Sequence, residues 1–266
     1  MSASYWCSSQ RQKWQYTRDQ LTRIRADLGD NCNVHNRIFL HSLIVKLGGK
    51  LNLRQVILST AEVFLNRFLT RATLKEVNAY LLVTTCIYLG CKIEESPVHI
   101  RNIVNESRNA WPEFIPSDPT KLAEFEFYLI EEMDCYMVIH HPYNSLVQIV
   151  QVLKTGDFKV GITSDEQKIA WSIVNDSYIT DLPLLFPPHI TAIAAVYMAC
   201  ILMDDNIYKN QRVNSFIKFL AVSNVDLDEV IEAVQEMLTL YENWNGYDEI
   251  SIRNSLNFRI LSLNNA

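Results

Sequence analysis

The residues of this chain that could do chemistry are few, and the densest charged group among them is Lys92, Glu94 and Glu95. They stand in the stretch YLGCKIEES, at residues 88–96, directly after an uncharged run from Ala79 to Leu89. Paired carboxylates can serve as a general acid and a general base, but no nucleophile accompanies this pair in the sequence. The cluster therefore indicates a junction or a binding contact rather than a catalytic site.

The histidines and cysteines show no spacing that suits a metal or a nucleophile. His35 and His41 are six residues apart, and His140 and His141 are adjacent, so neither pair shares a helix face in a ligand geometry. The six cysteines lack CxxC spacing, which predicts free thiols in a reducing compartment. We expect no metal, no cofactor and no catalytic residue.

Composition favours helices and argues against nucleic acid as a direct partner. The 266 residues include only 7 glycines, 48% are hydrophobic, and the net charge is −6. A protein that grips phosphates needs a positive surface, which this balance does not favour. The first residues, MSASYWCSSQRQKW, hold no apolar signal core, so we expect an intracellular, soluble chain without a membrane partner.

Capping signals and apolar periodicity predict the helices that must position these residues. Ser9 and Gln12 suggest a capping box, Gly48-Gly49 a helix stop, and Asp118 before a proline a helix start. The expected helices of the first half are 9–28, 34–47, 53–68, 79–93 and 119–133, with a shorter element after Pro97. Those of the second half are 143–153, 164–182, 189–203, one through Phe216, and 225–244.

An internal repeat suggests two similar domains. Tyr88-Leu89-Gly90-Cys91 recurs as Tyr197-Met198-Ala199-Cys200, 109 residues later, and each copy precedes an acidic pair, Glu94-Glu95 and Asp204-Asp205. Both helices are apolar almost all round, as is typical of a central helix wrapped by neighbours. We expect an N-terminal helix at 1–30, domains at 31–139 and 143–247, and a polar tail at 248–266. Residues 135–139 could form a strand, but we expect a connector.

Local spacing leaves two interpretations of the charged cluster open. Lys92 suits the negative end of its helix dipole, and Glu94 and Glu95 precede Ser96-Pro97, where the next helix could begin, so a solvated junction explains the charges. On a helical wheel, however, Lys92 lies beside Leu81 and Tyr88, as a contact for another protein would.

Longer stretches identify a family. CKIEE, YWCSSQRQKW, EFEFYLIEEMDCYMVIHHPY and WSIVNDSYITDLPLLFPP resemble the cyclins, and among them the C-type cyclins of the Mediator kinase module, over residues 5–248. The resemblance implies an all-α fold of two consecutive five-helix cyclin-box domains with an extra N-terminal helix. It also implies a nuclear, non-catalytic subunit that activates a cyclin-dependent kinase and regulates RNA polymerase II transcription. The implied partners are that kinase and other Mediator kinase-module subunits.

The resemblance assigns a role to two residues. Cyclins press the first box against the C-helix of the kinase, which holds the C-helix glutamate against the lysine that binds ATP phosphates. The family's box lysine and its fifth-helix glutamate match Lys92 and Glu126. Without the family, Glu126 is one acid among Glu124, Glu131 and Glu132 on a solvated helix.

One family feature is not carried over. Cell-cycle cyclins recruit substrates through a first-helix motif, Met-Arg-Ala-Ile-Leu-x-x-Trp. The matching residues 36–43 keep the arginine and the leucine, but Asn36 replaces the methionine and Leu43 the tryptophan. We therefore do not expect substrate docking at this patch.

A second candidate surface involves Asn175, Asp176, Trp6 and Tyr241. Asn175 borders an apolar stripe of Trp171, Val174, Tyr178 and Leu182, while Asp176 lies away from it. An asparagine there needs hydrogen-bond partners, either inside the protein or in another kinase-module subunit that docks in a groove. Trp6 could line the same region or only anchor the first helix, and Tyr241 is a further candidate.

Two other classes of function remain as alternatives. A DNA-binding core like that of transcription factor IIB shares the fold, but it would need a basic face and usually a zinc ribbon. An enzyme would need a site that the sequence does not reveal. Lys92 and Glu126 exposed together on one face would favour kinase docking, whereas a continuous Lys/Arg stripe would favour DNA.

Overall fold

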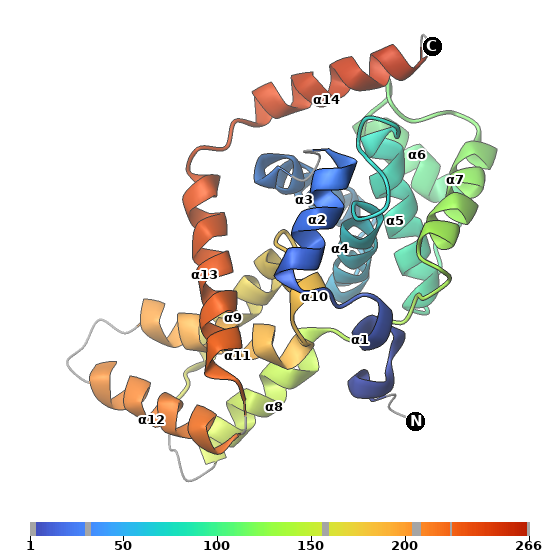
Figure 1. Ribbon diagram of the computed structural model, residues 1–266. Coiled ribbons are helices and arrows are strands. Elements are labelled where there is room, and N and C mark those ends of the chain that lie inside the picture. The colour runs from blue at the N-terminus through green and yellow to red at the C-terminus, as the bar shows by residue number, and fades with distance from the viewer. Residues whose placement is uncertain (1–3, 30–32, 156–159, 204–208, 224, 265–266) are drawn as a thin grey trace. The chain divides into compact units, whose positions relative to one another are not determined.

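The computed structural model describes residues 4–29, 33–155, 160–203, 209–223 and 225–264 (Figure 1). Every regular element within these ranges is a helix, which confirms the predicted all-α class. The chain divides into two compact units, one of Met1–Ile139 with Glu242–Ala266 and one of His140–Tyr241. Asp204 and Asp205, the second acidic pair of the repeat, lie outside the described residues.

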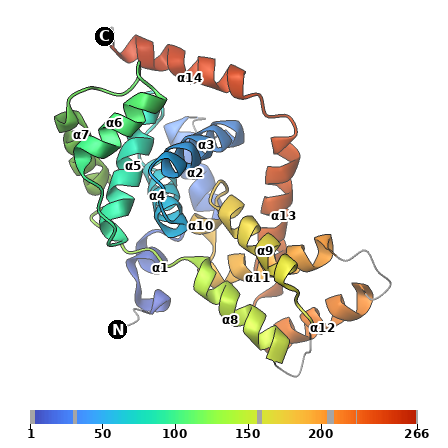
Figure 2. The same ribbon diagram turned by 180° about the vertical axis from the view of Figure 1, so that it is seen from behind.

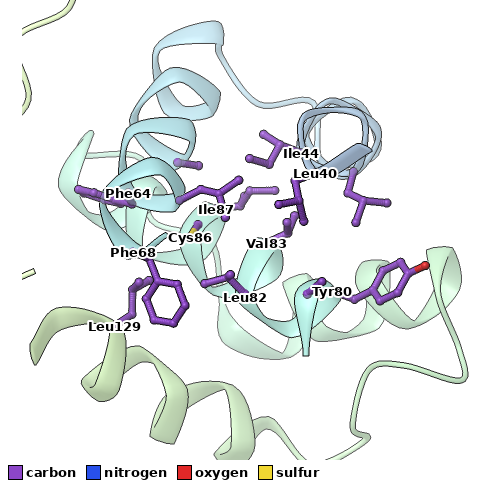
Figure 3. Close-up of a cluster of buried hydrophobic side chains, with 14 of the residues drawn as sticks. Leu40, Ile44, Phe64, Phe68, Tyr80, Leu82, Val83, Cys86, Ile87 and Leu129 are labelled. Carbon is purple, nitrogen blue, oxygen red and sulfur yellow. The ribbon is translucent and has the colours of Figure 1, made fainter. Parts of the chain in front are cut away.

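The first unit is built around α5. Its helices are η1 (Tyr5–Cys7), α1 (Ser9–Lys13), α2 (Arg18–Leu28), α3 (Val34–Lys50), α4 (Gln55–Phe68), α5 (Ala79–Ile93), α6 (Ile100–Ala110), α7 (Pro119–Glu132) and α14 (Glu249–Asn264). Helix α5 packs against α3, α4, α6 and α7. Figure 3 shows Leu82, Val83, Cys86 and Ile87 of α5 pointing among these neighbours, and all four side chains are fully buried. Burial of each large apolar side chain contributes about 1.5–3 kcal/mol, so α5 holds the unit together.

The N-terminal helix is interrupted where a single helix over 9–28 was predicted. The first piece, α1, is capped by Ser8 and ends at Trp14, and Thr17 opens α2 with a capping box to Gln20. Trp14 is 1% exposed, with the Arg67 guanidinium 4.9 Å from its ring centroid. The helix is interrupted here because burial of the Trp14 indole is more favourable than continuation of a polar helix.

Gly48 does not stop a helix, contrary to the prediction. Helix α3 runs through Gly48 and Gly49 to Lys50. A Cβ at Gly48 would lie 2.3 Å from a methyl carbon of Leu58, so this glycine permits a close approach of α3 and α4.

The second unit is built around α11. Its helices are α8 (Pro142–Thr155), α9 (Ser164–Ser177), α10 (Leu182–Leu185), α11 (Pro188–Leu202), α12 (Lys209–Val222) and most of α13 (Leu227–Trp244). Helix α11 packs against α8, α9 and α12, which matches the place of α5 in the first unit. The repeat Tyr88–Cys91 and Tyr197–Cys200 therefore marks the central helix of each unit.

Helix α9 differs from its prediction at both ends. Thr163 caps it in a capping box with Glu166, one residue earlier than expected. It ends at Ser177 instead of near Leu182, because the Thr180 hydroxyl donates to the Ser177 carbonyl and a separate turn, α10, begins before Pro183.

The predicted polar tail at 248–266 contains a helix. Helix α14 returns to the first unit and packs on α3, and Leu256 and Ile260 are 2% and 3% exposed in its core (Figure 2). The Tyr80 hydroxyl donates to Asn257 Oδ1 at 2.8 Å. Among the described helices, none has both the length and the apolarity needed to cross a bilayer.

Candidate docking site

Lys92 and Glu126 meet at the surface of the first unit. Lys92 lies in the last turn of α5 and Glu126 in the middle of α7, and these helices pack directly on each other. The Lys92 ammonium donates to Glu126 Oε1 at 2.6 Å and to Oε2 at 2.8 Å. The fold thus joins two residues that are 34 positions apart, but Glu126 is buried, so the two side chains are not exposed together as the kinase-docking prediction required.

The two partners of this ion pair differ in burial. The Lys92 side chain is 41% exposed, whereas that of Glu126 is 9% exposed. The ammonium also lies 4.4 Å from the ring centroid of Tyr88, one turn earlier on α5. Lys92 therefore covers the carboxylate and still presents part of its charge to solvent.

The charge of Lys92 is fixed over the physiological pH range. Burial lowers its pKa, but the hydrogen bond and charge of Glu126, together with Tyr88, raise it, and the net pKa lies above the ordinary lysine value. Because a raised lysine pKa favours the protonated form, the ammonium stays available as a donor at neutral pH.

Glu94 and Glu95 have separate roles, and the next helix does not begin at Ser96-Pro97, directly after them, as the junction interpretation supposed. Glu94 caps α5, and its Oε1 accepts from the Thr60 hydroxyl of α4 at 2.6 Å. Glu95 is exposed in a left-handed conformation, with φ of 53°. Helix α6 starts only at Ile100, capped by His99, because the chain needs a turn after α5. Of the acidic pair, Glu94 ties α4 to α5 and Glu95 faces solvent.

An exposed aromatic residue on α7 was missed. Phe127 follows Glu126 on α7 and is 74% exposed, although Phe125 of the same helix packs against the core. The sequence held a signal, since Phe125 and Phe127 are two residues apart and cannot share one helix face. Phe127 adds an exposed apolar side chain to α7.

The patch that matches the family's substrate motif is built into the first unit. Leu43 of α3 is 4% exposed. It lies at a cavity of about 320 Å³ that Tyr80, Phe114, and Arg253 and Asn257 of α14 also line. Helix α14 therefore covers part of this face of α3.

In the second unit, Asn175 and Asp176 belong to a hydrogen-bond network. The Tyr143 hydroxyl donates to Asn175 Oδ1 at 2.8 Å, and Trp171 stacks on Tyr143 with ring centroids 4.7 Å apart. The Tyr241 hydroxyl donates to Asp176 Oδ2 at 2.9 Å. Burial, followed by the charge of Asp176, raises the pKa of Tyr241, so its hydroxyl keeps its proton. The network joins α8, α9 and α13, as the internal interpretation of Asn175 requires.

Trp6 belongs to the first unit. It lies in η1, is 59% exposed, and makes an edge-to-face contact with Tyr5 at 5.5 Å between ring centroids. Such an exposed indole can take part in binding another molecule.

The remaining chemistry-bearing groups form no site within the described residues. No three His, Cys, Asp or Glu side chains there come together in a way that could hold a metal ion. Cys86 and Cys91 of α5 are buried, and burial raises both thiol pKa values, that of Cys91 to about 11. These thiols pack rather than react.

Comparisons with known proteins identify a family. Residues 5–138 match the family model described as the cyclin N-terminal domain. An RNA polymerase II holoenzyme cyclin-like subunit of Scheffersomyces stipitis is 43% identical, covering 98% of this chain and 99% of that protein. The subunit of the same description from Saccharomyces cerevisiae is 40% identical, covering 94% of each chain.

Solved structures show the same fold. A chain in the structure of the CAK complex of Chaetomium thermophilum bound to ATP-γ-S gives a TM-score of 0.75 at 17% identity, covering 97% of this chain and 88% of that one. A chain of the yeast TFIIK (Kin28/Ccl1/Tfb3) complex gives 0.67 at 20% identity, covering 88% of this chain and all of that one.

Proposed function

Because the chain belongs to the cyclin family, we propose that it binds and activates a cyclin-dependent kinase of the Mediator kinase module and thereby regulates RNA polymerase II transcription. Its relatives are described as RNA polymerase II holoenzyme cyclin-like subunits, which supports this assignment. Cyclins are regulatory subunits, so the chemistry belongs to the kinase. A role in transcription supports the proposal that the protein acts in the nucleus.

The Lys92–Glu126 ion pair is the observation that carries the proposal. A Lys92 ammonium that is part exposed and firmly charged can donate to a partner helix while Glu126 fixes its position. Charged pairs of this kind set register and specificity, and apolar anchors such as Phe127 supply affinity. The docked surface holds the kinase C-helix in its working position, which shifts a two-state equilibrium toward the active form.

We assign residues 31–139 and 143–247 as the two cyclin boxes, with the docking surface on the first. The Asn175, Asp176 and Tyr241 network of the second unit is proposed as a surface for another subunit of the kinase module, and the exposed Trp6 of the first unit is proposed separately as a contact residue for such a subunit. The support for the network surface is the set of part-buried polar groups that α8, α9 and α13 bring together. This second role is separate from kinase docking.

An ion-pair exchange tests the docking assignment. Lys92→Glu with Glu126→Lys keeps an internal ion pair but reverses the charge that the kinase helix meets. We expect the melting temperature to change little and the affinity for the kinase to fall by about 30-fold or more, as for the loss of a charged interface contact worth about 2 kcal/mol or more. Binding is measured by titration with the purified kinase, and activation by phosphate transfer to a substrate.

The matched control is Lys121→Glu with Glu124→Lys. Both residues of this pair lie on α7, at 57% and 64% exposure, and their exchange should alter neither the melting temperature nor the affinity for the kinase. If the Lys92/Glu126 exchange variant bound and activated the kinase as well as the wild type does, the assignment would be contradicted.

A further inference from the structure

Helix α13 carries two apolar faces, and only one of them is buried. Val230, Ala233, Met237 and Leu240 point into the second unit and are at most 2% exposed. A second line of apolar residues remains accessible. Leu227 and Ile231 are each 45% exposed and Leu238 is 54% exposed, with Val234 half-buried between them.

The second line has the spacing of a helix-packing seam. Leu227, Ile231, Val234 and Leu238 follow one another at intervals of four, three and four residues. Such residues align along one side of an α-helix and can interlock with a second helix laid beside it. We call these four residues the outer stripe of α13. A contiguous exposed apolar stripe of this kind marks an interaction site.

The charged residues of the segment that carries the outer stripe all have one sign. Residues 225–241 contain the acids Asp226, Asp228, Glu229, Glu232 and Glu236, and no Lys, Arg or His. At 100° per residue, Asp228 and Glu232 lie on the side of the stripe that faces away from the core. An acidic border repels nucleic acid and an anionic membrane surface, which attract basic residues. It attracts a helix that has its own apolar stripe and basic flanks.

We propose that the outer stripe of α13 is the docking surface for a basic amphipathic helix of another protein. Apolar side chains of that helix pack between Leu227, Ile231, Val234 and Leu238, and its Lys or Arg residues meet the acidic border. The contact is independent of kinase docking at Lys92 and Glu126.

A designed peptide pair tests this surface with the full-length chain. The probe is a fluorescent helical peptide of about 20 residues with leucines in heptad spacing and lysine flanks, and its partner has glutamate in place of each lysine. Fluorescence anisotropy is measured at low and high salt. We expect saturable binding of the lysine peptide that weakens with salt, and little binding of the glutamate peptide.

Variants locate the contact. The double variant Ile231→Gln with Leu238→Gln should lower the affinity for the lysine peptide by about tenfold or more, because it removes central apolar anchors. Gln235→Lys places a positive charge beside the stripe and removes no acid. It should lower the affinity for the lysine peptide several-fold. The control is Val147→Gln on α8, equally exposed at 45%, which should not change binding.

Three outcomes would overturn the proposal. The first is that neither peptide binds, and the second is equal binding of both peptides. The third is a wild-type dimer in analytical ultracentrifugation that the Ile231/Leu238 variant dissociates, since the occupant would then be a second copy of the chain. The affinity of the outer-stripe variants for the kinase is measured as well. If they lose peptide binding and keep their kinase affinity, the result bears on this proposal and not on the proposed function.

Discussion

At the scale of single residues, the unequal burial of Lys92 and Glu126 decides how the docking site can be tested. Removing Lys92 alone leaves the nearly buried carboxylate of Glu126 without its partner, which costs stability as well as affinity. A single substitution would therefore mix folding with docking. The ion-pair exchange avoids this because it preserves the internal contact.

The cysteines give a second prediction at this scale. Burial raises the pKa of Cys91 to about 11 and that of Cys86 well above the ordinary value, so at pH 8 both are protonated and shielded. The exposed Cys7 and Cys135 should react quickly with a maleimide, and Cys86 and Cys91 only in denaturant. Peptide mass spectrometry of the labelled protein checks this. Fast native labelling of Cys86 or Cys91 would contradict the packing of α5.

The residue scale also shows the limit of sequence reasoning. Spacing left Lys92 open between a junction and a contact, because its partner is 34 residues away and the packing of α5 on α7 brings them together. The family resemblance supplied Glu126. Phe127 was missed although its neighbour Phe125 hinted that one of the two faces outward.

At the scale of elements, glycines inside helices control how closely α4 approaches its neighbours. A Cβ at Gly90 of α5 would lie 3.1 Å from the carbonyl oxygen of Ile57 in α4, and backbone cannot shift cheaply. Gly90→Ala should therefore destabilise the protein by about 1–3 kcal/mol. Gly49→Ala, where nothing lies within 4 Å, should be neutral or stabilising, since alanine is the better helix former.

Urea denaturation followed by circular dichroism compares the two glycine variants. Equal stabilities would mean that α4 and α5 can separate without cost.

Most helices were predictable, and two of the three errors named here have tertiary causes. The start of α7 after Asp118 was correct, because an N-cap acid and a first-turn proline act within one turn. The break at Trp14, the passage of α3 through Gly48 and the end of α9 at Ser177 were not predicted. The first two depend on tertiary contacts, with Arg67 and with Leu58, which local propensity does not encode.

At the scale of the whole molecule, the first unit is assembled from both ends of the described chain. Residues 242–264 follow the second unit in the chain but belong to the first unit, where α14 joins the helices of residues 4–139. This return of the chain was not predictable from the sequence, because α14 lacks a clear apolar stripe and is held in place by a few buried residues. Its contacts with α3 and Tyr80 make the stability of the first unit depend on a distant segment.

This dependence gives the last prediction. Leu256→Ala leaves a cavity where α14 packs in the core of the first unit, so it should cost about 2–5 kcal/mol. Hydrogen exchange should then speed up in α3 and α5 and stay unchanged in α9 and α11, which belong to the other unit. Ile250→Ala on the same helix, at a residue that is 68% exposed, is the control and should leave exchange as in the wild type. If Leu256→Ala loosened both units equally, or neither, α14 would not be part of the first unit's core.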